Sequence, residues 1–167
     1  MRGPNGPPLP PVASAELSSQ IYNAALALLA RREHSQQELQ QKLLKRFPDS
    51  ETLVHETLAR LDREGYQSDQ RYIEAYIRSR LNKGYGAQRV RQELRLRGLT
   101  ADLVDSALVE LRNDEQNLEQ LIHVWRKKFK IPPKGPKEKF RQISFLRYRG
   151  FSAAEIDKLF CHLLHEE

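Results

Sequence analysis

The chain has 167 residues, of which 39% are hydrophobic and 30% charged, and its formal net charge is +6. This length allows one ordinary domain or a short row of small ones. A single cysteine excludes a disulfide framework, and the longest apolar run, residues 24–30, is too short to cross a bilayer. Because the N-terminus also lacks the apolar stretch of a secretory signal, we expect a cytoplasmic protein with no membrane partner.

The beginning of the chain differs in composition from the rest. Residues 3–14 contain five prolines and little that a core could bury. We therefore predict that residues 1–17 form a disordered leader outside the fold. From residue 18 onward the apolar positions follow the period of an α-helix, and no alternating strand pattern of useful length is present.

The helical part contains an internal repeat. Residues 94–101 (LRLRGLTA) align with residues 146–153 (LRYRGFSA) at a shift of 52 positions. Gly98 and Gly150 stand where a helix should end in the left-handed conformation. An apolar stripe with spacing i, i+4, i+7 follows each glycine, and a third stripe occurs earlier in the chain. After Gly98 the stripe is Val104, Leu108 and Leu111, and after Gly150 it is Ile156, Phe160 and Leu163; the earlier stripe is Val54, Leu58 and Leu61.

Each stripe is the third helix of a predicted three-helix module. The first helices are expected at residues 19–32, 69–81 and 114–130, and the second at residues 36–46, 87–97 and 137–149. Ser35 and Ser152 each open an S-x-x-E capping box. The predicted modules span residues 18–66, 67–113 and 114–167.

A module of about fifty residues would be only marginally stable alone, so neighbouring modules should share buried faces. The fold class that follows is all-α, with three tandem three-helix modules stacked into an elongated, curved row. A globular packing of nine helices is the alternative arrangement.

The positive charge is concentrated in two segments. Residues 78–97 contain seven cations and one carboxylate, Glu93, whereas residues 126–149 contain ten cations and one carboxylate, Glu138. Such clusters attract polyanions, although a solvated surface is the alternative reading. The predicted contact residues are Arg78, Arg80, Lys83, Arg89, Arg91, Arg95, Arg97, Arg126, Lys127, Lys128, Arg147 and Arg149.

The aromatic residues divide into two groups. Most occupy apolar helix faces and are expected in the core: Tyr72, Tyr76, Trp125, Phe129, Phe140 and Phe145. Tyr85 and Tyr148 are flanked by cations, so stacking on nucleic-acid bases is an alternative for these two.

The sequence lacks the motifs of an enzyme. Neither phosphate-cradling glycine pattern, G-x-x-x-x-G-K-[ST] or G-x-G-x-x-G, is present, and the H-E-x-x-H zinc motif is absent as well. The carboxylates Asp102, Asp105 and Asp157 lie in first turns of predicted helices, where the helix dipole explains them. We expect no catalytic residue, no cofactor and no metal.

Several segments resemble the RecX family of regulatory proteins. They are residues 34–43 (HSQQELQQKL), 65–72 (GYQSDQRY), 78–86 (RSRLNKGYG), 89–94 (RVRQEL), 97–99 (RGL) and 146–151 (LRYRGF). The resemblance runs from about residue 19 to the end of the chain. One departure is Gln67-Ser68, where the family commonly has Leu-Asp.

The resemblance implies a modulator of the RecA recombinase. RecX-like proteins bind the RecA–DNA filament along its groove and mainly inhibit strand exchange, ATP hydrolysis and co-protease activity, in the context of DNA repair and the SOS response. Non-specific binding to single- and double-stranded DNA is also associated with the family. The alternative is a non-specific DNA-binding helical protein that competes with the recombinase for DNA. We expect a monomer, since the apolar stripes are used within the row.

Overall fold

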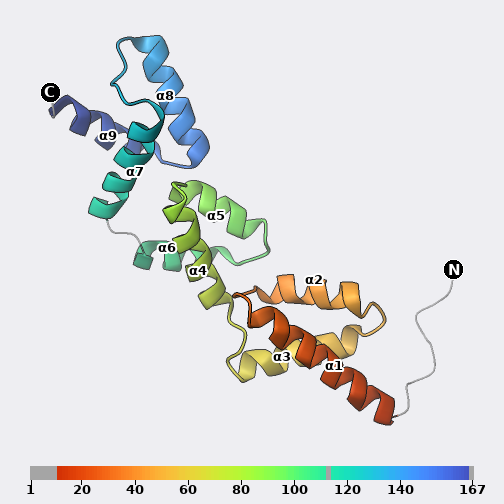
Figure 1. The fold of residues 1–167 in the computed structure, drawn as a ribbon. Coiled ribbons are helices and arrows are strands. Elements are labelled where there is room, and N and C mark those ends of the chain that lie inside the picture. The colour runs from red at the N-terminus through yellow and green to blue at the C-terminus, as the bar shows by residue number, and fades with distance from the viewer. Residues whose placement is uncertain (1–10, 112–113, 166–167) are drawn as a thin grey trace. The chain divides into compact units, whose positions relative to one another are not determined.

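The computed structural model describes residues 11–111 and 114–165, which form helices joined by short turns (Figure 1). The chain divides into two compact units, one ending at Asp69 and the other beginning at Gln70. Unit 1 contains module 1, and unit 2 contains modules 2 and 3. The described helices are α1 (Pro11–Leu29), α2 (Gln36–Arg46), α3 (Glu51–Arg63), α4 (Asp69–Asn82), α5 (Ala87–Arg95), α6 (Ala101–Leu111), α7 (Asp114–Lys128), α8 (Pro136–Arg149) and α9 (Ala153–His165).

Module 1 consists of α1, α2 and α3 around one apolar core. That core includes the predicted stripe of α3 together with residues from the other two helices: Ile21, Ala25, Leu39, Leu43, Val54, Leu58 and Leu61. Helix α2 begins at Ser35, whose Oγ accepts a hydrogen bond from the amide of Glu38 at 3.1 Å. This contact satisfies one of the amides that a helix start leaves without a partner.

The first helix is longer than predicted. It begins at Pro11, so residues 11–17 of the predicted leader are helical. Leu17 packs against the module 1 core, which gives these residues a reason to be ordered. Proline is well tolerated at a helix start, where its missing N–H would have no partner in any case. Residues 1–10 of the predicted leader lie outside the described part of the chain.

Modules 2 and 3 each have a core of their own. Module 2 comprises α4, α5 and α6, and Ile73, Ile77, Val90 and Leu94 lie at the centre of its core. Module 3 comprises α7, α8 and α9, and its core is built around residues that include Leu121, Trp125, Leu146, Ile156 and Leu159. Within the described residues the secondary structure is therefore all-α, with three tandem three-helix modules, as predicted.

The helix ends confirm the glycine and serine signals of module 3. Gly150 has φ +94° and ends α8, and its module 2 counterpart Gly98 has φ +77°. Ser152 and Glu155 form the predicted capping box: the Ser152 amide donates to the Glu155 carboxylate at 2.7 Å, and the Glu155 amide donates to Ser152 Oγ at 3.3 Å. Helix α5 ends at Arg95 and α7 at Lys128, two residues earlier than predicted in each case.

One aromatic residue assigned to the core is not there. Phe140 is 74% exposed, whereas Trp125 is 2% exposed. On α8 the buried face is formed by Gln142 and Leu146. Gln142 belongs to this face because its side chain accepts from Trp125 Nε1 at 2.7 Å and donates to the Ile131 carbonyl at 3.2 Å, so both buried polar groups have partners.

Candidate functional site

In module 2, most of the cations predicted to bind a partner already bind module 2 itself. Glu93 of α5 accepts from Tyr76 Oη at 2.8 Å and forms ion pairs with Arg80 at 2.8 Å and Arg89 at 3.1 Å. Burial raises the pKa of the Glu93 carboxyl, but the hydrogen bonds from Tyr76 and Arg89 and the two guanidinium charges outweigh it, so the pKa lies below its ordinary value. Glu93 is therefore ionised and holds α4 against α5.

A second carboxylate neutralises the other side of α5. Asp105 of α6 lies 2.5 Å from Arg91 Nε and 3.8 Å from Arg95 Nη2. Arg78 lies 3.8 Å from Glu74, one turn earlier on α4. In these two long pairs the arginine side chains are more than half exposed. Exposed pairs contribute about 0–1 kcal/mol, so an external anion could replace the carboxylate partners of Arg78 and Arg95.

The remaining two cations of the segment 78–97 differ from each other. Arg97 donates to the Tyr72 hydroxyl at 3.3 Å and lies over the Tyr76 ring at 4.9 Å. Lys83 makes no ion pair, hydrogen bond or ring contact through its side chain within the described chain. Folding therefore uses most of these seven cations, because packing brings Glu93, Asp105 and tyrosines beside them. Their binding to a partner stays a prediction.

Modules 2 and 3 meet where the start of α5 contacts the end of α8. The Gly86 amide donates to the Arg149 carbonyl at 2.8 Å, and the Gln88 amide donates to the Gly150 carbonyl at 3.1 Å. The C-terminal carbonyls of α8 therefore satisfy amides at the start of α5, and the two helix dipoles meet with opposite ends. A Cβ atom on Gly86 would lie 2.3 Å from the Gly150 carbonyl oxygen, so the contact requires glycine.

Tyr85 lies inside this joint. Its ring is contacted by the guanidinium groups of Arg80 at 5.2 Å, Arg89 at 4.6 Å and Arg149 at 5.2 Å. These cation–π contacts occupy the half-buried ring. Stacking of a nucleic-acid base on Tyr85, which the sequence left as an alternative for Tyr85 and Tyr148, is therefore not supported. Tyr148 is 75% exposed although Arg89 lies over its ring at 5.2 Å, and stacking there stays a prediction.

A cavity beside the joint gathers cations from both basic segments. It has a volume of about 400 Å³, and its cationic lining residues are Lys83 from the α4–α5 loop, Lys127 and Lys128 from α7, and Arg149 from α8. We call it the cationic cavity. Asn82, Gly84, Gln120, His123, Val124 and Phe145 complete the lining, which contains no carboxylate. Sequence reasoning found the four cations but not their proximity, and it missed His123, for which the sequence offers no signal.

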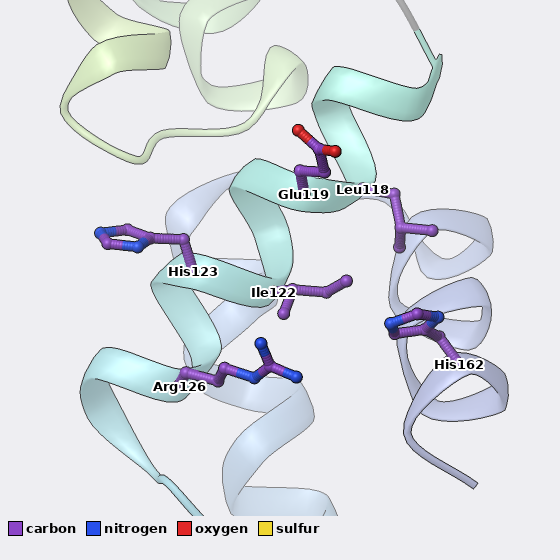
Figure 2. A pocket seen from close by; sticks show the side chains of 6 residues that line it. All are labelled: Leu118, Glu119, Ile122, His123, Arg126 and His162. Atoms are coloured by element: carbon purple, nitrogen blue, oxygen red, sulfur yellow. The ribbon is translucent and has the colours of Figure 1, made fainter. Parts of the chain in front are cut away.

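Three other predicted residues line two further cavities. Arg126 lines a cavity of about 530 Å³ between α7 and α9, together with Glu119, Ile122 and His162 (Figure 2). Figure 2 shows the His123 ring on the far side of α7, pointing away from His162. Arg89 and Arg147 line a third cavity with residues that include Glu93, Leu96 and Tyr148. These predicted residues therefore line three separate cavities.

Among the residues that the structure describes, no group of three or more His, Cys, Asp or Glu side chains is placed to hold a metal ion. None of the helices formed by these residues has the length and hydropathy needed to span a bilayer.

Comparison with known proteins identifies the family. Models of the first, second and third three-helix domains of RecX match residues 22–61, 68–108 and 114–160. The chain belongs to the RecX family. The three matches lie within the predicted modules 18–66, 67–113 and 114–167, whose precise boundaries stay a prediction.

Curated relatives and solved structures agree with this assignment. The chain is 42% identical over 140 residues to the regulatory protein RecX of Pseudomonas entomophila, covering 83% of this chain and 88% of the relative. It is 40% identical over 143 residues to that of Legionella pneumophila, covering 85% and 93%. A crystal structure of RecX from Lactobacillus salivarius is similar in fold, with a TM-score of 0.76 at 24% identity, covering 89% of this chain and 97% of that one.

Proposed function

We propose that this RecX-family protein regulates the RecA recombinase by binding the RecA–DNA filament in its groove, mainly inhibiting strand exchange, ATP hydrolysis and co-protease activity. Family membership carries the choice of partner. The supporting physical observation is the surplus of cations in modules 2 and 3, which suits a polyanionic filament. Regulation requires no chemistry by this chain: binding across neighbouring recombinase subunits would block their rearrangement or the addition of further subunits.

The contacts that cations make with carboxylates and tyrosines inside module 2 reduce the number of residues proposed to contact the filament. Lys83, Lys127, Lys128, Arg147 and Arg149 make no ion pair with a carboxylate in the described chain, and we propose these as the main filament contacts. Arg78 and Arg95 can contribute by exchanging their weak partners. Arg80, Arg89, Arg91 and Arg97 act mainly by holding module 2 together, and Arg126 contributes from its own cavity.

The test is RecA ATPase activity on single-stranded DNA with substoichiometric amounts of this protein. We expect ATP hydrolysis to fall with time as filaments shorten, and the Lys127→Gln/Lys128→Gln variant to inhibit less than the wild type. The matched control is Lys134→Gln/Lys137→Gln, which removes the same charge from the same basic segment. Absence of inhibition by the wild type would contradict the proposed function.

The second candidate function is non-specific DNA binding that inhibits by competition. It is favoured by the basic segment 126–149, in which at least nine of the ten cations make no ion pair with a carboxylate in the described residues. If about six phosphates are contacted, the slope of log affinity against log salt on single-stranded DNA is about −4. Inhibition that disappears when DNA is in large excess supports this candidate, whereas inhibition that persists supports the filament.

Three further properties belong to the same proposal. We propose that the protein acts in the cytoplasm, where the recombinase works, that it is a monomer, and that it binds single- and double-stranded DNA without sequence preference. Sedimentation velocity checks the oligomeric state directly.

A further inference from the structure

The cationic cavity concentrates positive charge at three helix ends. Lys83 follows the last residue of α4, Lys127 and Lys128 end α7, and Arg149 ends α8. A helix C-terminus carries roughly half a negative charge, so three of them supply about −1.5 against four cations. Helix dipoles therefore explain less than half of this positive charge, and no carboxylate in the lining supplies the rest.

Two of the four cations have contacts that fix them beside the joint between modules 2 and 3. Arg149 Nη1 donates to the Lys83 carbonyl at 3.3 Å and the Gly84 carbonyl at 3.4 Å, and its guanidinium lies 5.3 Å from the centre of the Phe145 ring. Lys128 Nζ lies over the same ring at 5.8 Å. Packing thus keeps the like charges of Arg149 and Lys128 beside one ring, and a bound anion would offset their repulsion.

We propose that the cationic cavity binds a backbone phosphate of a nucleic-acid strand, an assignment that rests on the DNA contact in the proposed function. Lysine ammonium groups bind phosphate as point charges with three donors each, and an arginine fork binds phosphate and carboxylate alike. The fork of Arg149 is partly occupied by the two carbonyls, so most of the free donors in the cavity belong to lysines. A nucleic-acid strand carries one phosphate per nucleotide, and this charge density suits a cavity lined by four cations and no carboxylate.

The cavity binds the phosphate and not the base. Phe145 is the aromatic residue of its lining, and this ring already packs edge-to-face on Phe129 at 5.3 Å under two cations. Readout of base identity is therefore not expected, and binding is independent of sequence. Because Lys83 belongs to module 2 and Lys127 to module 3, one bound phosphate would also link the two modules across their joint.

The test uses a fluorescein-labelled oligothymidylate and the full-length protein without recombinase, with anisotropy titrations at several salt concentrations. We expect the Lys83→Gln/Lys127→Gln variant to bind the oligonucleotide about tenfold more weakly, because a charge-assisted contact is lost. The slope of log affinity against log salt should become smaller by about 0.7. The matched control Lys134→Gln/Lys137→Gln removes equal charge outside the cavity and should change the affinity less than about twofold. Far-ultraviolet circular dichroism melts verify that both variants are folded. Equal weakening by both variants would overturn the proposal, because it would show diffuse electrostatic attraction.

Two further measurements separate this proposal from neighbouring ones. If the cavity variant binds DNA normally but no longer inhibits the recombinase, the cavity binds an acidic group of the recombinase; the phosphate assignment then fails while the proposed function stands. If it loses DNA binding but still inhibits, the phosphate assignment stands and the filament contact lies elsewhere. ATP is added as a competitor at a phosphate concentration equal to that of the oligonucleotide. If ATP does not displace the oligonucleotide, the ligand of the cavity is a nucleic-acid strand. If ATP displaces it, the proposal is overturned and the ligand is a free nucleotide.

Discussion

The basic segments 78–97 and 126–149 look alike in sequence, but their cations are used differently. In the first, Glu93 and Asp105 together hold Arg80, Arg89, Arg91 and Arg95, so the positive charge is largely neutralised inside module 2. In the second, Glu138 is the only carboxylate, and its side chain accepts from the Lys134 amide instead of pairing with a cation. A cationic run is therefore available to a partner only when packing brings no acid beside it.

The largest effect is expected from Gly150→Ala, which breaks the joint that brings the two segments together. The residue has φ +94°, and an added Cβ would lie 2.4 Å from Arg89 Cβ. Strain at positive φ and overpacking together should cost about 3 kcal/mol. The fluorescence of Trp125, the single tryptophan, reports unfolding of module 3 in urea.

The matched control for the joint is Gly135→Ala, where an added Cβ would meet nothing within 4 Å. Because Gly135 is the N-cap of α8, alanine should cost less than about 1 kcal/mol there. Similar losses of stability in the two variants would show that the joint contributes little.

The next effect concerns Glu93→Gln, which removes the acid shared by Arg80 and Arg89. We expect module 2 to lose about 1–2 kcal/mol, because a partly buried charged network loses its anion. Amide hydrogen exchange in peptides covering α4 and α5 measures this loss. Glu74→Gln is the control, since Glu74 pairs with Arg78 at 3.8 Å on the surface and should cost less than about 0.5 kcal/mol. Equal protection in the two variants would refute a structural role for Glu93.

The same carboxylate predicts a dependence on pH. The pKa of Glu93 is lower in the folded protein than its ordinary value, so on acidification the unfolded chain binds this proton first. The stabilisation is present above the ordinary glutamate pKa of about 4.3 and is lost as the pH falls through the lower folded pKa. Exchange of α4 and α5 amides, corrected for intrinsic rates, should show a shallower acid dependence in Glu93→Gln. An unchanged profile would assign the acid sensitivity to other groups.

The smallest effect is expected from Asp105→Asn, which makes module 2 more like module 3. Releasing Arg91 and Arg95 should strengthen oligothymidylate binding about two- to threefold and steepen the log–log salt slope by at most about 0.7. Asp102→Asn removes the same charge from the first turn of the same helix, α6, and controls for net charge. If the two variants gain equally in anisotropy titrations, net charge alone explains the change.

The repeated helices are predictable from the amino-acid sequence, because their signals are local. The stripe Ile156 and Leu163, the capping box of Ser152 and the left-handed Gly150 each involve residues within about two turns of one another. The family resemblance rests on similarly local segments. Phe140 was misplaced because α8 buries a polar residue, Gln142, that the apolar pattern could not distinguish from a surface position.

Which cations are available to a partner depends on contacts between residues that are far apart in the chain. Arg91 and Asp105 are 14 positions apart, and Arg149 and Lys83 are 66 apart, so neither contact has a periodic signal in the sequence. The Gly86–Gly150 joint and the cationic cavity arise because separate modules pack backbone against backbone. Charge is a property of each residue, whereas neutralisation depends on distance, and distance between remote residues is set by packing.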